Sequence, residues 1–125
     1  MKNNIYKTKT FYRWQRKNFI SDKKLRQAVL EIKQGLIDAD LGVGLIKKCI
    51  ANSGFGKSSG YRVLIATNQK DKWFFIFGFA KNENDNIDYN QLSILKLVSK
   101  SLLEMSYLDI AIMLDANELL EIEYA

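Results

Sequence analysis

The middle of the chain contains three apolar runs separated by short polar turns. The runs cover Leu45–Ala51, Tyr61–Thr67 and Trp73–Ala80, and they are rich in β-branched and aromatic residues. Runs of this length and composition, bounded by Gly, Asn and Asp, are typical of buried strands. The pattern therefore predicts three consecutive strands that pair in chain order as a meander and form the core of the fold.

Apolar residues at helical spacing predict helices on both sides of this meander. Ser21 is a suitable N-cap for a helix that Gly35 can end. Asp88 or Asn90 can begin a later helix, and Ser106 a second one. The buried stripe of the first helix and that of the later one follow the i, i+3, i+4, i+7 pattern, and they consist of Leu25, Ala28, Val29 and Ile32, and of Leu92, Leu95, Val98 and Leu102.

The N-terminal region predicts a strand followed by a short helix. Ile5–Phe11 is interpreted as an edge strand on which lysines discourage aggregation, and Tyr12–Asn18 as a basic, aromatic helix whose Trp14 packs inward. Asp38 and Asp40 are two residues apart. They are a conceivable metal or acid pair, but turn residues between helix and strand are favoured. The final EIEYA is either a frayed end or a small added strand.

Together these elements predict an α+β fold in which helices pack against one face of the sheet. With 125 residues and 47% apolar content, the chain has enough material for a single core. We expect one domain over residues 1–125, with residues 104–125 as a C-terminal helical extension. No apolar signal region or membrane span is visible, and the single Cys49 cannot form an internal disulfide, so we expect a cytoplasmic protein.

The charge is divided unevenly along the chain. Residues 1–81 hold 17 Lys and Arg against 5 Asp and Glu, a net charge of +12, whereas residues 82–125 hold 2 against 9, a net charge of −7; together they give the overall +5. A basic body with an acidic tail is expected of a nucleic-acid binder, because neutralising phosphates releases counterions. An uneven but merely solvated surface is the alternative.

The absence of histidine restricts the possible chemistry. Imidazole acid–base catalysis, nucleophilic triads with histidine and histidine-containing zinc sites are excluded, and one cysteine cannot form a thiolate cluster. Any catalysis must use Lys, Arg, Tyr or carboxylates. No cofactor or metal is expected.

One stretch resembles a phosphate-binding loop but lacks its context. Residues 51–58, ANSGFGKS, differ from G-x-x-x-x-G-K-S only at Ala51. Such a loop needs a following helix whose N-terminus points at the phosphates. Here a strand-like sequence follows, which argues against nucleotide hydrolysis and leaves Lys57 as a glycine-flanked cation that can reach a phosphate.

Three ordered segments resemble one protein family. GLIDADLGVGLIKK, GFGKSSGYR and FGFAKNENDNI together are similar to the RelE/ParE superfamily of bacterial toxins, and more narrowly to a RelE-type, HigB-like subfamily of type II toxin–antitoxin modules. The resemblance covers nearly the whole chain. It implies a RelE-like, microbial-RNase-like antiparallel sheet with N-terminal and C-terminal helices packed on it.

The resemblance also implies a function and a partner. RelE-type relatives are endoribonucleases (mRNA interferases) that cut messenger RNA, usually on the ribosome, and so inhibit translation. An antitoxin, expected here to be of the helix-turn-helix type, silences them. ParE-type relatives inhibit DNA gyrase instead. The basic strands favour the RNA-cutting branch, whereas a gyrase inhibitor or a degenerate toxin acting only as corepressor are the alternatives.

Site residues are carried over by position and chemistry. RNA can be cut without metal when its own 2′-hydroxyl attacks the adjacent phosphorus. Arg62 is expected to clamp the phosphate, Lys47 or Lys57 to act as base, and Lys81 to stabilise charge or protonate the leaving oxygen. The residues expected to bind substrate are Lys48, Tyr61 and Asn82. Cys49 and Asn82 depart from the family pattern, in which cations are expected at both positions.

Overall fold

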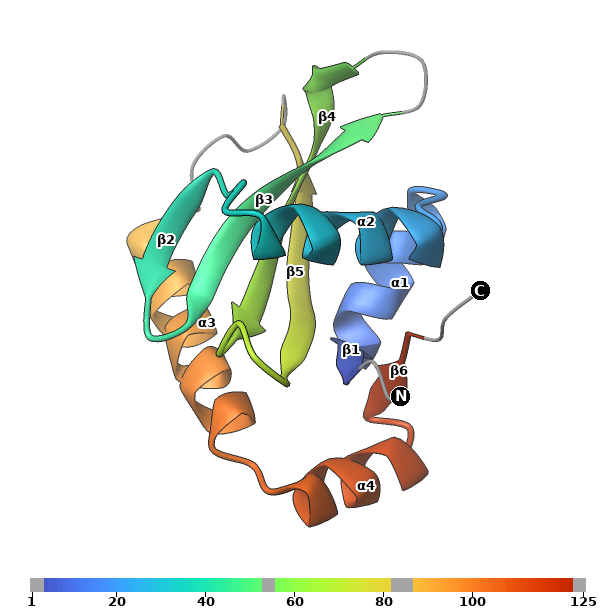
Figure 1. Ribbon diagram of the computed structural model, residues 1–125, viewed down its shortest axis with the longest axis vertical. Coiled ribbons are helices and arrows are strands. Elements are labelled where there is room, and N and C mark those ends of the chain that lie inside the picture. Colours follow the sequence, from blue (N-terminus) through green and yellow to red (C-terminus); the bar gives the residue numbers. More distant parts are fainter. Residues whose placement is uncertain (1–3, 53–55, 82–86, 123–125) are drawn as a thin grey trace.

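A six-stranded sheet with helices on both faces forms the fold (Figure 1). The computed structural model describes residues 4–52, 56–81 and 87–122, and the side chains of residues 52 and 56–59 are not described. The helices are α1 (Lys9–Lys17), α2 (Asp22–Lys33), α3 (Tyr89–Leu103) and α4 (Tyr107–Asp115). The strands are β1 (Ile5–Thr8), β2 (Ala39–Gly42), β3 (Leu45–Asn52), β4 (Gly56–Thr67), β5 (Trp73–Ala80) and β6 (Leu119–Glu121).

The predicted meander is confirmed. The spatial order of the strands is β2-β3-β4-β5-β1-β6, and β3, β4 and β5 pair antiparallel in chain order. β4 begins at Gly56, five residues before the predicted start. Because a strand occupies residues 56–67, no helix follows the loop-like ANSGFGKS stretch, as a phosphate-binding loop requires.

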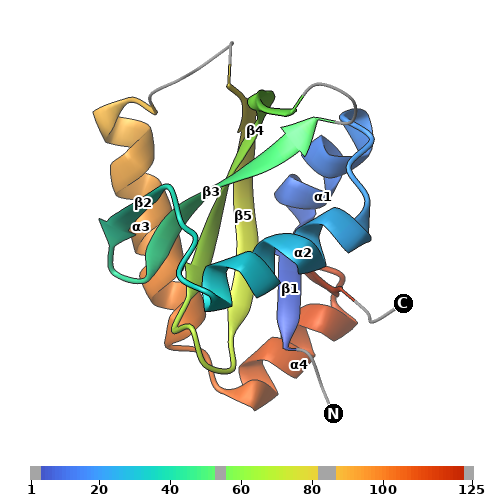
Figure 2. The same cartoon turned by 45° about the horizontal axis from the view of Figure 1, so that its top comes forward.

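The prediction that helices cover one face of the sheet was wrong, because each face carries its own apolar core under helices. α1 and α2 cover the face that bears Ile46, Val63 and Ile65, while α3 and α4 cover the face that bears Leu45 and Leu64. Figure 1 and Figure 2 both show α2 in front of the sheet and α3 behind it. Val63, Leu64 and Ile65 are fully buried. β4 is therefore buried on both faces, which explains its unbroken apolar run.

The predicted N-caps of three helices are confirmed. Ser21 accepts a hydrogen bond from the Lys24 N–H, Asp88 caps α3, and Ser106 forms a capping box with Asp109. Gly35, with a φ of +89°, follows the end of α2 in the left-handed conformation that glycine tolerates.

The prediction of an N-terminal edge strand was wrong. β1 covers only Ile5–Thr8 and lies inside the sheet, parallel to β5 on one side and antiparallel to β6 on the other. The C-terminal strand β6 thus forms the edge. Thr8 caps α1, so Lys9 and Phe11 are helical, and Lys7 is buried rather than displayed at an edge.

The segment expected to be a turn contains a further strand. β2 pairs antiparallel with β3 from Ala39↔Lys47 onward, and Gly42, Val43 and Gly44 all have positive φ in the tight hairpin that joins them. β2 is polar and has little strand propensity of its own, so pairing with β3 accounts for its conformation. Asp40 accepts a hydrogen bond from the Gly42 N–H, as a turn residue does.

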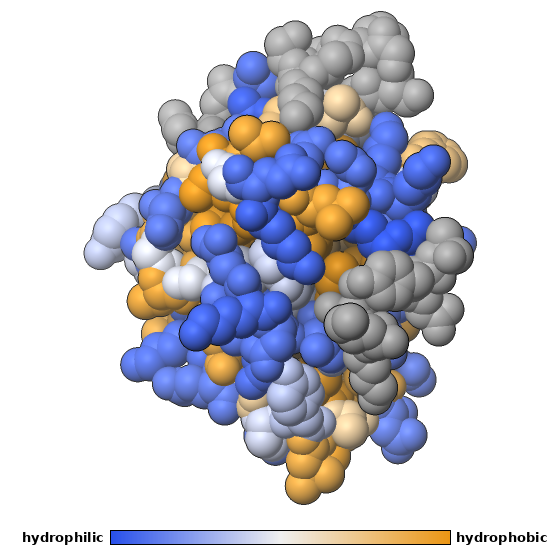
Figure 3. Space-filling model, in the orientation of Figure 1, coloured by the Kyte–Doolittle hydropathy of each residue, from blue (hydrophilic) through white to orange (hydrophobic). Residues whose placement is uncertain are grey.

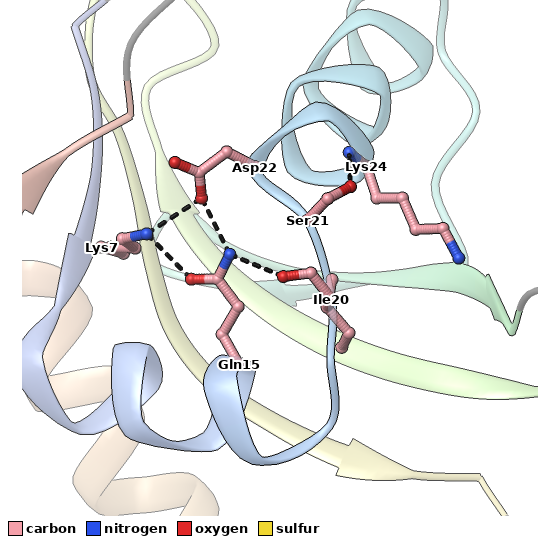
Figure 4. A network of polar contacts seen from close by, with 6 residues as sticks. All are labelled: Lys7, Gln15, Ile20, Ser21, Asp22 and Lys24. Carbon is pink, nitrogen blue, oxygen red and sulfur yellow. Dashed lines mark hydrogen bonds and ion pairs between the residues drawn. The ribbon is translucent and has the colours of Figure 1, made fainter.

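A polar network joins β1 to the two N-terminal helices (Figure 4). The Lys7 ammonium donates to Gln15 Oε1 and Asp22 Oδ1, both at 2.9 Å, and Gln15 Nε2 donates to Asp22 Oδ1 and to the Ile20 carbonyl. Lys7 and Gln15 are each 5% exposed. Each of the side chains of Lys7, Gln15 and Asp22 therefore has a hydrogen-bond partner, as is usual for buried polar groups.

Removing the Lys7 ammonium should destabilise the fold. In Lys7→Met, Gln15 Oε1 and Asp22 Oδ1 lose a common donor, and we expect the free energy of unfolding to fall by about 1–3 kcal/mol. Urea unfolding followed by circular dichroism measures this change. An unchanged unfolding midpoint would show that the network contributes nothing to stability.

The same network should make stability depend on pH. Burial raises the pKa of Asp22, but the hydrogen bonds from Gln15 and Lys7 outweigh it and hold the pKa below its ordinary value. A lowered folded pKa gives stability that is present above the unfolded pKa, about 4, and is lost as the pH falls through the folded pKa. Unfolding of Asp22→Asn should depend less on pH below about 4 than that of the wild type. The exposed Asp115→Asn is the matched control and should behave like the wild type.

Gly78 is required by the packing of Trp14, which was correctly predicted to point inward. The Trp14 ring lies directly over Gly78, and a Cβ added there would overlap three of its ring atoms. We expect Gly78→Ala to displace the indole and to cost about 1–3 kcal/mol of stability. Urea unfolding and a red-shifted tryptophan emission would report this. Unaltered emission and stability would contradict it.

Candidate nucleic-acid interface

The register between β3 and β4 places three of the relevant side chains on one face. Lys47 pairs with Leu64, and Cys49 pairs with Arg62. Side chains alternate along a strand, and Leu64 belongs to the core under α3. Lys47, Cys49 and Arg62 therefore share the face that α3 covers further down. Lys47 and Arg62 are diagonal neighbours, a relation that typically separates residues by about 7–8 Å.

β5 adds aromatic rings and a third cation to this face. Phe79 pairs with Arg62 and Phe77 with Leu64, and the two ring centroids are 6.1 Å apart. Phe79 is 6% exposed and Phe77 is half-buried. The Lys81 N–H donates to the Gly60 carbonyl at 3.1 Å, which extends the β4–β5 ladder by one more pair. Lys81 thus follows Phe77 and Phe79 at the same end of the sheet.

Arg62 is held by two neighbours but is not closed off from solvent. Its Nη1 donates to Cys49 Sγ at 2.6 Å, and its Nε lies 3.9 Å from Asp38 Oδ2. The side chain of Arg62 is 18% exposed and that of Asp38 is 37% exposed. The contact with Asp38 is near the upper limit for an ion pair. The guanidinium is therefore oriented while part of it faces outward.

The positions of Asp38, Phe77 and Phe79 beside Arg62 were not predicted from the sequence. Asp38 is 24 positions before Arg62 and had been interpreted as a turn residue, so no local spacing connects the two. The phenylalanines were detectable in principle, because pairing β4 with β5 puts a residue of β5 opposite Arg62. In the sequence, both belong to an apolar run that predicts only a buried strand.

Lys48 lies on the opposite face. Its ammonium is 2.7 Å from Glu31 Oε1 on α2 and donates to the Leu36 carbonyl at 2.9 Å, and the residue is 3% exposed. Tyr61 also faces away from Arg62, because its ring packs edge-on against Trp14 with centroids 5.5 Å apart. The structure therefore does not bring Lys48 and Tyr61 together with Arg62.

Two other expected residues lie beyond what the structure describes. Lys57 is in the first part of β4, but its side chain is outside the described atoms, and Asn82 is outside the described residues. Within the described ranges, no group of three His, Cys, Asp or Glu side chains is placed to hold a metal ion. No helix among them is long and apolar enough to cross a membrane.

This arrangement suits an anionic, aromatic ligand. A guanidinium with free edges binds phosphate oxygens in pairs, and two flanking ammonium groups add charge without fixed geometry. The accessible part of Phe77 offers an apolar surface beside them. Lys47, Arg62, Lys81 and Phe77, referred to below as the Arg62 face, have the composition of a single-strand nucleic-acid site.

A family comparison places the chain. Residues 3–122 match the family model described as the RelE toxin of the RelE/RelB toxin–antitoxin system. The match covers nearly the whole length, and the chain therefore belongs to the RelE toxin family. The α+β architecture is consistent with this fold. Family membership indicates a toxin of a toxin–antitoxin system that has an antitoxin partner. A search of curated proteins found no match.

Two adjacent lysines give a matched test of the geometry. Lys48→Met removes a buried ammonium from Glu31 and from the Leu36 carbonyl, and we expect a loss of about 1–3 kcal/mol in the free energy of unfolding. Lys47→Met changes a half-buried side chain on the other face and should stay within about 0.5 kcal/mol of the wild type. Chemical unfolding of both variants measures the difference. Equal losses would mean that the faces are assigned wrongly.

Proposed function

We propose that this toxin is a ribosome-dependent messenger-RNA endoribonuclease of the HigB-like type, which inhibits translation. The observation that supports the proposal most is the placement of Lys47, Arg62 and Lys81 on one sheet face beside Phe77, with Lys81 at the end of the sheet where β5 ends. Figure 1 shows β3, β4 and β5 extending past the end of α3, which leaves this end of the sheet free of that helix. A messenger-RNA strand has the phosphates and bases that such a surface binds.

In the proposed reaction, the RNA supplies its own nucleophile. The 2′-hydroxyl attacks the adjacent phosphorus, the bond to the 5′-oxygen of the next nucleotide breaks, and the products are a 2′,3′-cyclic phosphate and a 5′-hydroxyl. Arg62 clamps the phosphate and stabilises the charge that develops on its oxygens. Lys47 or Lys57 takes the proton of the 2′-hydroxyl, and Lys81 stabilises charge or returns a proton to the leaving oxygen. The reaction balances without metal or cofactor.

The contacts of Arg62 fit the role of a phosphate clamp. Cys49 occupies Nη1 and Asp38 lies at 3.9 Å from Nε, so the second terminal nitrogen, Nη2, has no partner among the described residues. A guanidinium that is already oriented by two neighbours loses less rotational freedom when it binds phosphate, which favours a fixed geometry. Asp38 and Cys49 thus serve as positioning residues for Arg62.

We also propose the setting in which the toxin acts. The whole chain works as one toxin domain in the cytoplasm, and the residues after α3 are an extension of it. Its antitoxin carries a helix-turn-helix domain and blocks the Arg62 face, either by covering it with acidic residues or by shifting the helices beside it. Strongly basic surfaces favour an acidic cover, because complementary charge speeds association.

Arg62→Ala should abolish cleavage. Translating ribosomes are incubated with each variant and the new 5′ ends of messenger RNA are mapped. The wild type and Lys70→Ala, which removes an exposed cation from the β4–β5 turn, should produce new ends, whereas Arg62→Ala should lose at least about 100-fold in rate. Arg62→Lys should also be impaired, because an ammonium cannot bind two phosphate oxygens as a planar fork does. Circular dichroism checks that each variant is folded.

Other outcomes identify the alternatives. Growth arrest without new 5′ ends, together with loss of the DNA supercoiling activity of gyrase, would make the chain a gyrase inhibitor of the ParE type. No growth defect when the chain is expressed alone would make it a degenerate toxin that acts only with its antitoxin. Full activity of Arg62→Ala would remove this residue from the site.

Binding of a single-stranded RNA to the Arg62 face should depend steeply on salt. With about four phosphates neutralised, the slope of log affinity against log salt concentration is expected near −3, at about −0.7 per phosphate. Arg62→Ala should make the slope shallower by about 0.7, the value of one phosphate contact, while Lys70→Ala should leave it unchanged. A flat dependence would argue for a protein target.

A further inference from the structure

The outer surface of α1 carries only positive charge. Its charged residues are Lys9, Arg13, Arg16 and Lys17, and the helix contains no Asp or Glu. Arg13, Arg16 and Lys17 are exposed, and together with Tyr12 they line a hollow of about 360 Å³. In Figure 3, the side chains over the turn between α1 and α2, at the upper right, are mostly hydrophilic. The cations are thus gathered around one shallow, open surface.

Among the residues that the structure describes, no carboxylate forms an ion pair with Arg13, Arg16 or Lys17. Asp22, the first acidic residue after α1, is bound by Lys7 and Gln15. Arg16 instead lies over the Tyr12 ring, with its guanidinium carbon 5.8 Å from the ring centroid. An arginine stacked on an aromatic ring keeps its edge N–H groups available for an anion. These cations are therefore available to a bound anion.

Phe19 projects from the end of the same helix at a cost to stability. Its side chain is 92% exposed, and its φ of +56° is in the left-handed region that favours glycine or asparagine. Its N–H donates to the Arg16 carbonyl, so this backbone conformation ends α1. A residue chosen only to end the helix would be Gly or Asn. A fully exposed phenylalanine at such a position indicates a contact outside the chain.

We propose that Arg13, Arg16, Lys17 and Phe19, referred to below as the α1 surface, bind structured RNA. The cations contact the phosphates of a double-stranded stem, and the Phe19 ring stacks on a base that is unpaired beside it. RNA-binding proteins use both kinds of contact, because duplex phosphates provide affinity and unstacked bases can stack on an aromatic ring. The α1 surface lies on the opposite face of the sheet from the Arg62 face, and so it provides a second, separate RNA contact.

The composition of the surface favours RNA over a membrane. Between residues 9 and 21, all of which the structure describes, Phe19 is the only exposed large hydrophobic side chain. Membrane-bound amphipathic helices bury an apolar face, whereas the apolar face of α1 is already buried against β1 and β5 through Phe11 and Trp14. A single ring amid three cations matches one stacked base and several phosphates.

Binding to two RNA hairpins tests the proposal. Both have a stem of about 16 base pairs, the span of a typical duplex-binding module, and one carries a single bulged nucleotide. All proteins carry Arg62→Ala so that the RNA stays intact, which makes the result independent of the cleavage proposed above. The charge variant is Arg13→Gln, Arg16→Gln and Lys17→Gln, and its control removes three cations elsewhere, with Lys33→Gln, Lys70→Gln and Lys100→Gln.

For both hairpins, the slope of log affinity against log salt concentration should be shallower by about 2 to 3 in the charge variant. The control should change this slope much less. Phe19→Asn should weaken binding to the bulged hairpin by about 5- to 100-fold and leave the other hairpin unchanged, whereas Phe19→Trp should retain binding. Because asparagine tolerates the left-handed backbone, Phe19→Asn should keep or raise the thermal stability.

Three results would overturn the proposal. The first is an equal effect of the charge variant and its control. The second is a Phe19→Asn variant that binds both hairpins as the parent does, or that unfolds at a lower temperature. The third is binding to vesicles of phosphatidylglycerol and phosphatidylcholine that depends on Phe19 while hairpin binding does not.

Discussion

The register of β3 against β4 determines on which face of the sheet Lys47, Lys48 and Arg62 lie. Side chains alternate between faces, so a slip of one residue would exchange the two sets. If β3 slipped by one residue, Lys47 would point under α2, and Lys48 would lose its contact with Glu31. Two contacts resist such a slip from opposite faces: the ion pair of Lys48 with Glu31 at 2.7 Å, and the Arg62–Cys49 hydrogen bond at 2.6 Å. The buried Val63 and Leu64 fix the same register through the core.

Because some cations are buried, the total positive charge overstates the number of cations that can bind a ligand. Lys7 and Lys48 are each at most 5% exposed, and each is bound to a carboxylate and to an uncharged oxygen. Isolated ammonium groups could not be buried in this way, because desolvation would exceed any gain. These two lysines join helices to the sheet. The cations available to ligands are therefore fewer than the total, and two groups of them lie on the Arg62 face and on the α1 surface.

Much of the fold was predictable because its signals are local. Apolar runs specified β3, β4 and β5, and Ser21, Asp88 and Ser106 mark the true helix starts. The misplaced elements depend on distant partners. β1 was expected at an edge, but its central place follows from pairing with β5 and β6, and β2 is a strand only because β3 lies beside it. Neither partner is visible in the local pattern.

The candidate site was likewise predictable where its signals are local, but not where they depend on distant partners. That Lys47 and Lys48 face opposite sides follows from alternation alone, but which side is buried depends on where α2 packs. The contact of Asp38 with Arg62 spans 24 positions and has no sequence signature. Tyr61 was equally compatible with a core or a ligand role until Trp14 was located against it.

The central claim, that one sheet face receives the RNA strand, is tested most directly by nuclear magnetic resonance. A short single-stranded RNA with 2′-O-methyl groups cannot attack its own phosphate and so stays bound intact. On titration, the Arg62 Nε–H signal and the Lys47 and Phe77 signals should shift together, while those of Lys48 and Tyr61 stay in place. Shifts centred on Lys48 and Tyr61, or none at Arg62, would contradict the account.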